Sequence, residues 1–451
     1  MQAECKSSSL EFAEAPPKIL QKSPIFAEIA QLVEHNLAKV GVASPSLVFR
    51  SMQRDCQEIG DLFLLLSPFL CIFATEFSTG DMGIKIHNPF FDRREDELQL
   101  DATLFRDVMV EQSSPILPAE WYPQSGVQLT WPHQNTDWAY MLDEVQACFK
   151  QVAKEIAARE LLLIVTPEPE AVKAQIADSV NMKNVRFFQC PTNDTWARDH
   201  GAICLTDSIS PHILDFCFNG WGNKFPAEMD NAITRQLYEA KMLNGTYENH
   251  LDFVLEGGSI ESDGHGTLLT TTQCLLNPNR NPRLNAVEIE EALKVMLHVE
   301  RILWLHHGNL RGDDTDSHID TLARFCSTTS IAYVQCNDPD DAHYEELQLM
   351  EEELKAFRQA DGTPYQLFPL PMAAPVWEDG EQLPATYANF LILNDAVLYP
   401  IYQQTADAQA REVLQAAFPK KEIVGVDCRP LICQHGSLHC ITMQYPIGVL
   451  K

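Results

Sequence analysis

The run FLILNDAVLY at residues 390–399 decides the fold class of this chain. Two apolar stretches flank Asn394 and Asp395, residues that favour a tight turn, so the run predicts a β-hairpin. A segment with helical periodicity follows at 406–417, and another apolar strand follows at 422–426. Paired strands, then a helix, then a further strand indicate a mixed α/β architecture.

The same alternation of short strands with helices runs through the chain from about residue 115. Apolar residues recur with helical spacing in the longer segments, and short apolar runs separate those segments. The strands 202–205 and 213–216 are predicted to pair across a Ser-Pro turn. No sequence repeat is visible, although the alternation points to a repeated structural unit. The predicted helices cover 138–159, 171–178, 287–297 and 342–359, and the predicted strands cover 161–165, 185–188, 202–205, 213–216, 253–255 and 302–305.

Residues 1–113 differ from the rest of the chain and contain no group of catalytic side chains. Their most apolar run, 61–74, is too short to span a bilayer comfortably, and Pro68 interrupts it. We therefore expect an N-terminal extension over 1–113 and a catalytic domain over 114–451. The extension is expected to be dispensable for the chemistry. The alternative is a helical cap or an oligomer interface that buries the face 63–73.

The amino-acid composition indicates which kinds of substrate or partner the protein can bind. The 451 residues are 45% hydrophobic and carry a formal net charge of −30, which suits a globular core and cationic substrates and opposes nucleic-acid phosphate or an anionic membrane. The 13 cysteines form no C-x-x-C pair, and the N-terminus lacks the pattern of a signal peptide. We expect a cytoplasmic protein with reduced thiols and a small cationic substrate. The sequence is also compatible with assembly into a homo-oligomer.

Three separated residues supply the parts for covalent attack on a cationic carbon: Cys440, His318 and Asp320. A thiolate can attack such a carbon while a histidine moves protons to and from the reacting groups. His318 and Asp320 alternate with one apolar residue, so in an extended segment both would face the same way. Two alternatives stand beside this reading: most cysteines are inert core residues, and the acidic run 312–320 is also compatible with a metal or a capped loop. The ligand spacing of calcium and zinc sites is absent, which favours acid–base chemistry.

Two further carboxylates stand beside glycines, Asp199 in TWARDHG at 195–201 and Glu256 in LEGGS at 255–259. A guanidinium is planar, permanently charged and presents its donors as a fork, which two carboxylates can hold from either side. Arg198 is expected to pair with its neighbour Asp199. Together these residues predict a hydrolase that acts on a guanidinium group without a metal or another cofactor.

Several motifs in fixed order resemble the agmatine deiminase and bacterial peptidylarginine deiminase family. The similarity covers about 115–446 and does not include the N-terminal region. One departure concerns the stretch 434–437, QHGS, where the family commonly has a run of glycines, and this puts the identity of the substrate in doubt. The matching motifs are AEW at 119–121, WP at 131–132, TNDTWARD at 192–199, EGGSI at 256–260, NPNRNP at 277–282, GDDTD at 312–316, HID at 318–320, YANF at 387–390 and HCIT at 439–442.

The resemblance implies a five-bladed, pseudo-symmetric α/β propeller of the guanidino-modifying type, with an extra N-terminal segment and a central active site. It implies deimination of agmatine to N-carbamoylputrescine and ammonia, a step of polyamine biosynthesis. The alternatives are a peptidylarginine deiminase and a non-catalytic binder of guanidino ligands. The roles it implies are Cys440 as nucleophile, His318 as acid and base, Asp199 and Asp320 as the grip on the guanidinium, Glu256 as support, and Trp196, Asn389 and Trp121 as substrate-binding residues.

Overall fold

The computed structural model describes residues 115–207 and 209–451. All of the expected extension over 1–113, with its apolar run at 61–74, lies outside the described residues. Within the described part, the strands form five small sheets and one separate hairpin. No helix among these residues is both long enough and apolar enough to cross a membrane.

The hairpin predicted around Asn394 forms as expected. Leu391 of β15 (Leu391–Ile392) pairs with Leu398 of β16 (Ala396–Ile401) in antiparallel register, and β16 then pairs in parallel with β17 (Glu422–Asp427). Helix α13 (Ala406–Ala417) connects the two parallel strands. This unit therefore consists of an antiparallel pair, a helix and a parallel third strand.

Each of the other four sheets repeats that internal order, since one inner strand has an antiparallel neighbour on one side and a parallel neighbour on the other. The sheets contain β4 (Ile203–Leu205), β5 (His212–Cys217) and β6 (Thr246–Val254); β7 (Ile260–Ser262), β8 (Thr267–Thr271) and β9 (Arg301–Leu305); β10 (Ala323–Ser327), β11 (Ser330–Gln335) and β12 (Gln366–Pro371); and β18 (Thr442–Pro446), β1 (Gln124–Thr130), β2 (Leu161–Thr166) and β3 (Val185–Gln189). The sheet that contains β1 has a fourth strand, β3, which pairs in parallel with β2. The separate hairpin pairs β13 (Val376–Glu378) with β14 (Glu381–Leu383).

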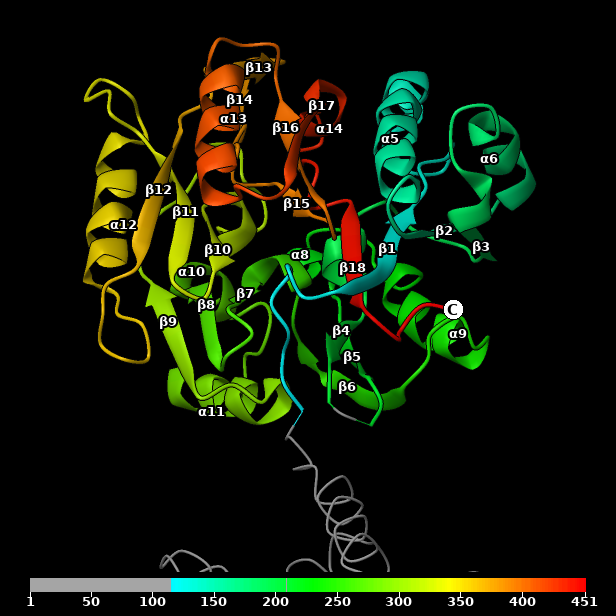
Figure 1. The fold of residues 1–451 in the computed structure, drawn as a ribbon, viewed down its shortest axis with the longest axis horizontal. Coiled ribbons are helices and arrows are strands. Elements are labelled where there is room, and N and C mark those ends of the chain that lie inside the picture. The colour runs from blue at the N-terminus through cyan, green and yellow to red at the C-terminus, as the bar shows by residue number, and fades with distance from the viewer. Residues whose placement is uncertain (1–114, 208) are drawn as a thin grey trace, which may run out of the picture. The chain divides into compact units, whose positions relative to one another are not determined.

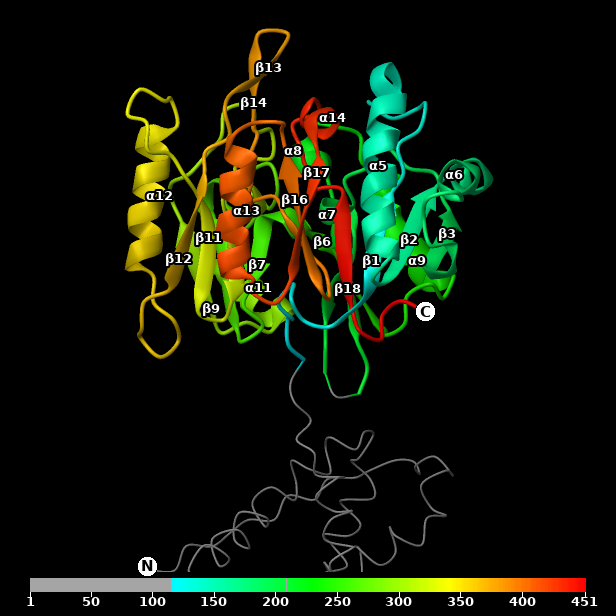
Figure 2. The same ribbon diagram turned by 45° about the horizontal axis from the view of Figure 1, so that its top comes forward.

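In every sheet a helix leads from this inner strand to its parallel neighbour. Figure 1 shows these connecting helices at the periphery of the described part, with the strands inside them, and Figure 2 shows the β13–β14 hairpin projecting beyond the rest. The connecting helices are α5 (Leu142–Ala157), α9 (Ile233–Glu239), α11 (Ala286–Leu297), α12 (Tyr344–Ala356) and α13. The remaining helices are α6 (Pro169–Ile176), α7 (Ala197–His200), α8 (Gly220–Asn223), α10 (Thr272–Leu275), α14 (Arg429–Ile432) and the 3-10 turns η2 (Ala139–Met141), η3 (Met182–Asn184), η4 (Asp230–Ala232), η5 (Gly257–Ser259) and η6 (Ile319–Thr321).

The predicted helices and strands lie within a few residues of the observed ones, but several strands were missed. For example, the helix predicted at 342–359 is α12, and the pairing of 202–205 with 213–216 is that of β4 with β5. The strand β8 was missed because three of its five residues are threonines, although all five are buried. An alternation of apolar and polar residues cannot identify a strand whose polar side chains are also inside.

The last sheet is completed by segments from opposite ends of the described chain. Strand β18 pairs antiparallel with β1, where Gln128 faces Met443 and Leu129 faces Thr442 (Figure 1). The hydroxyl of Tyr445 also donates to Oε1 of Gln128 at 2.7 Å. This closure places Cys440 directly before a strand whose position depends on β1.

The packing of α5 against its sheet predicts how a substitution in this core changes the free energy of unfolding. Phe149 of α5 is fully buried and meets Trp131 edge to face, with ring centroids 5.6 Å apart. Phe149→Ala should lower the free energy of unfolding by about 3–5 kcal/mol, because it removes buried apolar surface and leaves a cavity. Val295→Ala, on the exposed face of α11, should change it by less than about 0.5 kcal/mol. Urea unfolding followed by fluorescence measures both, and equal losses would contradict the packing described here.

Candidate active site

A cavity of about 360 Å³ brings together side chains from distant parts of the sequence. Four of the predicted site residues line it: Trp196, Asp199, His318 and Cys440. The predicted site residues come from all five connections between successive sheets: Asp199 follows β3, Glu256 follows β6, Asp320 follows β9, Asn389 follows β14 and Cys440 follows β17. The repeated architecture therefore points the sheet-to-sheet connections at a common centre.

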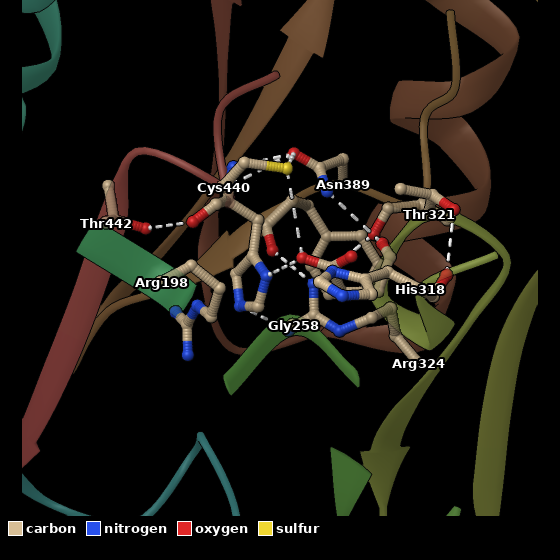
Figure 3. Close-up of polar contacts among 12 residues, drawn as sticks. Arg198, Gly258, His318, Thr321, Arg324, Asn389, Cys440 and Thr442 are labelled. Atoms are coloured by element: carbon tan, nitrogen blue, oxygen red, sulfur yellow. Dashed lines mark hydrogen bonds and ion pairs between the residues drawn. The ribbon is translucent and has the colours of Figure 1, made fainter. Parts of the chain in front are cut away.

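Asn389 holds the candidate nucleophile in place (Figure 3). Its Oδ1 accepts backbone N–H groups from His439 at 2.8 Å and from Cys440 at 3.3 Å, and it lies 3.3 Å from Sγ of Cys440. Its Nδ2 donates to the backbone carbonyl of Asp320 at 3.4 Å. Burial, together with the carboxylates of Asp320 and Asp199, raises the pKa of the Cys440 thiol well above its usual value. A bound cation would counteract these carboxylates and favour the thiolate.

Asp199 is fixed by donors on both of its oxygens. The backbone N–H of Gly258 donates to Oδ1 at 3.0 Å, and Nε1 of Trp221 donates to Oδ2 at 2.9 Å. Burial and the neighbouring carboxylates of Asp320 and Glu256 raise the pKa of Asp199 to about 6, against the opposing effects of His318 and the Trp221 hydrogen bond. This carboxyl group is thus held in a fixed orientation and titrates close to neutral pH.

Gly258 is a glycine because three functional side chains converge on it. A Cβ atom at this position would lie 2.7 Å from Nδ1 of His318, 2.8 Å from Oδ1 of Asp199 and 3.2 Å from Oδ2 of Asp320. These separations are shorter than van der Waals contact, so a side chain here would displace the functional groups. The glycines after Glu256, which drew attention in the sequence, therefore allow the backbone to approach the site closely.

The sequence argument for Asp320 placed it in an extended segment with His318, and that premise is wrong. His318 precedes the 3-10 turn η6, which contains Asp320. Both residues nevertheless reach the same centre. Burial alone would raise the pKa of Asp320, but the hydrogen bond and charge of His439, with the charges of His318 and Arg324, lower it. Asp320 does not line the cavity, but its Oδ2 lies 4.0 Å from Sγ of Cys440, which does, and its buried Oδ1 has no hydrogen-bond partner among the described residues.

His318 is surrounded by groups that favour its protonated form. Its Nδ1 lies 3.7 Å from Oδ1 of Asp199. Burial would lower the pKa of His318, but the carboxylate of Asp199, the thiol of Cys274 and the carboxylate of Glu256 together raise it well above 6.5. Its Nε2 has no hydrogen-bond partner among the described residues, and the side chain borders the cavity. The imidazolium can therefore give a proton to a group bound there.

Glu256 lies behind His318 and does not line the cavity. It is completely buried, and Nε of Arg280 donates to both of its carboxylate oxygens at 2.9 Å. Possible metal-ligating atoms of Glu256, Cys274 and His318 all lie within 4.8 Å of one another. Because Arg280 already occupies both oxygens of Glu256, this arrangement is better described as an ion pair that supports His318. Cys274 itself lies in α10, not in a strand as the apolar run around it suggested.

Two expectations about neighbouring residues change with the structure. Arg198 does not pair with Asp199: its Nη1 lies 3.6 Å from Sδ of Met443, and successive residues of α7 point in different directions. Trp121 does not line the cavity either, but packs against the core. The preceding residue, Glu120, is instead connected to the site through His439.

The departure at 434–437 retains a glycine where the geometry requires one. A Cβ on Gly436 would lie 2.1 Å from the ring of Trp196, so the backbone packs directly on the indole. His435 has a left-handed backbone with a φ of 64°, and its Nδ1 donates to the carbonyl of Gly312 at 2.6 Å. Gln434 and His435 both border the cavity. The altered stretch therefore forms part of the cavity wall next to the nucleophile.

A group of buried ionisable residues was missed by sequence reasoning. It consists of Glu120, Glu261, Arg324 and His439. Arg324 forms ion pairs with Glu120 and Glu261, and His439 bridges Glu120 to Asp320. The AEW and HCIT motifs contain two of these residues, but neither motif indicates that they meet. A second cavity of about 70 Å³ borders three of them together with Arg198.

Comparison with known proteins places the chain. The family model for Porphyromonas-type peptidyl-arginine deiminase matches residues 116–446. A Porphyromonas gingivalis structure described as a candidate arginine deiminase is 52% identical, has a TM-score of 0.72, and is covered in full by 75% of this chain. A cysteine-to-serine variant of C. jejuni agmatine deiminase with substrate bound is 40% identical, with a TM-score of 0.68 and coverage of 73% of this chain and 96% of that one.

A comparison of amino-acid sequences supports the same family. The agmatine deiminase of Pseudomonas aeruginosa strain LESB58 is 34% identical over 356 residues, which cover 73% of this chain and 95% of the relative. The matched region contains every residue of the site described above. The chain therefore belongs to the agmatine deiminase and Porphyromonas-type peptidyl-arginine deiminase family.

Proposed function

We propose that this protein hydrolyses agmatine to N-carbamoylputrescine and ammonia through a covalent adduct on Cys440. The charge of the cavity carries this proposal. Its described lining contains six aspartates and neither lysine nor arginine. Agmatine carries a guanidinium at one end, an ammonium at the other and no carboxylate, so both ends suit an acidic wall. The lining aspartates are Asp137, Asp194, Asp199, Asp230, Asp313 and Asp314.

Two of these aspartates favour a cation for a further reason. Burial, with the carboxylates of Asp230 and Asp137, raises the pKa of Asp194 to about 8, and burial raises that of Asp230 to about 7. Oδ1 of Asp194 has no hydrogen-bond partner among the described residues. A bound ammonium group would favour the ionised form of this pair and gain a charged hydrogen bond.

The chemistry follows from the positions of four side chains. Asp199 and the free oxygen of Asp320 hold the guanidinium, whose charge favours loss of the Cys440 thiol proton to solvent. The thiolate then forms a bond to the guanidinium carbon. His318 protonates one nitrogen, the carbon–nitrogen bond breaks and ammonia leaves. Neutral His318 next removes a proton from water, the hydroxide adds to the same carbon, and the carbon–sulfur bond breaks to release the ureido product.

The proposal also includes the arrangement of the five sheets around the cavity. We propose that the five sheets are the blades of a closed, pseudo-symmetric α/β propeller. Their shared strand order, the peripheral connecting helices and the pairing of β18 with β1 support this arrangement. All five connections between sheets contribute residues to the centre, as expected of blades arranged around an axis.

A second candidate is deimination of arginine within a peptide. Phe225 and Met229 line the cavity and remain 40% and 47% exposed, so the outer part of the cavity offers apolar contacts to a larger substrate. The match to the family model for Porphyromonas-type peptidyl-arginine deiminase also supports this candidate. The acidic wall opposes any substrate that carries a carboxylate near the guanidinium.

The nucleophile is tested by removing its sulfur. Cys440→Ala should lower ammonia release from agmatine on the order of 10⁴-fold or more, because no other side chain can form the adduct. Cys217→Ala, at the end of β5 and outside the cavity, should retain the activity of the unmodified protein. Steady-state ammonia assays and circular dichroism separate loss of chemistry from loss of fold. Turnover that persists without Cys440, or no turnover in the unmodified protein, would refute the proposal.

The titration of Asp199 predicts an acidic limit to activity. Its carboxylate must be ionised to hold a guanidinium, and its pKa is raised to about 6. The value of kcat/KM should therefore be retained above about pH 6 and fall about tenfold per pH unit below it. Asp199→Asn should lower kcat/KM and remove this ionisation from the pH profile. A profile of the unmodified protein that stays flat to pH 4.5 would contradict the role of Asp199.

Substrate choice follows from the acidic wall. We expect kcat/KM for agmatine to exceed that for arginine by about tenfold or more, since the arginine carboxylate would face the aspartates. Arginine amide lacks that carboxylate and serves as the matched control, so its rate should lie between the two. A peptide with C-terminal arginine completes the comparison, with ammonia release as the measurement. A preference for the peptide would support the second candidate in place of the first.

A further inference from the structure

A continuous row of buried side chains leads away from the catalytic centre behind Asp320. Nδ1 of His439 lies 2.7 Å from Oδ2 of Asp320, and Nε2 of His439 lies 2.8 Å from Oε2 of Glu120. His439 is 1% exposed and Asp320 is fully buried. None of the three residues lines the substrate cavity, but Oδ2 of Asp320 lies 4.0 Å from Sγ of Cys440, which does, so Asp320 is the member of the row nearest to the substrate.

The contacts of His439 bear on its protonation state. A neutral imidazole has one N–H donor and one acceptor nitrogen, whereas ionised carboxylates only accept. An imidazole that carries an N–H on both nitrogens would satisfy both carboxylate contacts at once. Arg324 also lies near, with Nη2 3.1 Å from Nε2 of His439, but it donates to the same Oε2 of Glu120 at 2.6 Å. Both side chains thus converge on one carboxylate oxygen.

Glu120 remains ionised and cannot move away. The backbone N–H of Ile392 donates to its Oε1 at 2.6 Å, and Arg324 is fixed on its other side by Glu261. Burial would raise the pKa of Glu120, but the charges of Arg324 and His439 hold it far below its usual range. Glu120 is therefore a permanent counter-ion that keeps His439 charged and fixes the plane of its ring.

Several charged groups surround Asp320, among them the buried guanidinium of Arg198, whose charge also favours the ionised carboxylate. His439 contacts its Oδ2, the charges of His318 and Arg324 also favour its ionised form, and Asp199 opposes that form by like charge. Sγ of Cys440 lies 4.0 Å from the same Oδ2. Without the charge of His439, the Asp320 carboxylate would lose its one direct cationic hydrogen bond while remaining buried beside Asp199.

We propose that His439 is a positioning residue: as an imidazolium between Glu120 and Asp320, it keeps Asp320 ionised and leaves the other oxygen of Asp320 free for the guanidinium. The inference rests on the proposed function, because it assigns Asp320 to the guanidinium. It adds that His439, a residue that touches neither the substrate nor the attacking sulfur, keeps the titration of Asp320 below that of Asp199.

The test replaces the charge while keeping a hydrogen-bond donor. His439→Gln retains an N–H for Asp320 but carries no charge. A nearby opposite charge lowers a carboxyl pKa by about 1–3 units, so loss of the His439 charge should raise the pKa of Asp320 toward that of Asp199. The acidic limb of kcat/KM should then contain two ionisations and steepen from about tenfold to as much as about 100-fold per pH unit, while activity near pH 9 approaches that of the unmodified protein. Glu120→Gln should steepen the limb in the same way.

A matched control separates this role from a structural one. His343 is 2% exposed, and its Nδ1 lies 2.7 Å from Oδ1 of Asp341, but it is outside the substrate cavity. His343→Gln should leave the acidic limb unchanged. If His439→Gln lowers activity equally at every pH without steepening the limb, His439 only supports the fold and the proposal is overturned.

A binding measurement distinguishes failure of this inference from failure of the proposed function. In a Cys440→Ser background, calorimetry measures agmatine affinity against pH with and without His439→Gln. A steeper pH dependence with His439→Gln supports the role of His439 even if the unmodified protein releases no ammonia from agmatine, in which case only the proposed function fails. An unchanged dependence, or no agmatine binding at any pH, overturns the inference.

Discussion

The burial of two like-charged carboxyl groups, Asp199 and Asp320, is the constraint on which the rest of the site depends. Both converge on Gly258 and both are almost completely removed from solvent. Such an arrangement is stable only if donors and cations surround it, because an uncompensated buried charge costs about 3–5 kcal/mol. The tryptophan, histidine and backbone donors around these two groups meet that requirement in the free protein.

Different kinds of hydrogen-bond donor stabilise the two buried carboxyl groups, and this difference affects how the site can bind a cation. Asp199 is held mainly by neutral donors, Trp221 and the backbone of Gly258, so it titrates near neutral pH. Asp320 is held by the charged His439, so it stays ionised over a wider range. Among the described residues no cation donates a hydrogen bond to Asp199, so the pocket of the free protein can still bind a cation. A guanidinium supplies the missing charge and at the same time favours ionisation of the Cys440 thiol.

The mixed α/β order of helices and strands and several residues of the cavity wall could be predicted from sequence because their signals are local. The hairpin at 390–399 and helix α13 follow from periodicity and turn residues within one segment. Asp199, His318 and Cys440 stand in short motifs whose order identifies the family, and all three border the cavity. Strands such as β8 were missed because their buried residues are polar, so their burial depends on neighbouring sheets.

The supporting residues could not be predicted because their roles exist only across long sequence separations. Glu120 and His439 are 319 positions apart and meet only when β18 lies beside β1. Arg198 looked like a partner for Asp199 because the two are adjacent in sequence, yet the turn of α7 separates their side chains. The partner of a charged residue depends on which distant segments fold next to it, and a local sequence pattern contains no information about those segments.

The pairing of β18 with β1 also has a consequence for the order of events during synthesis. The ribosome makes β1 long before β18, so the growing chain carries a strand edge without its final neighbour until β18 has emerged. Cys440 lies directly before β18, so the candidate nucleophile reaches its place in the cavity wall only when this pairing forms.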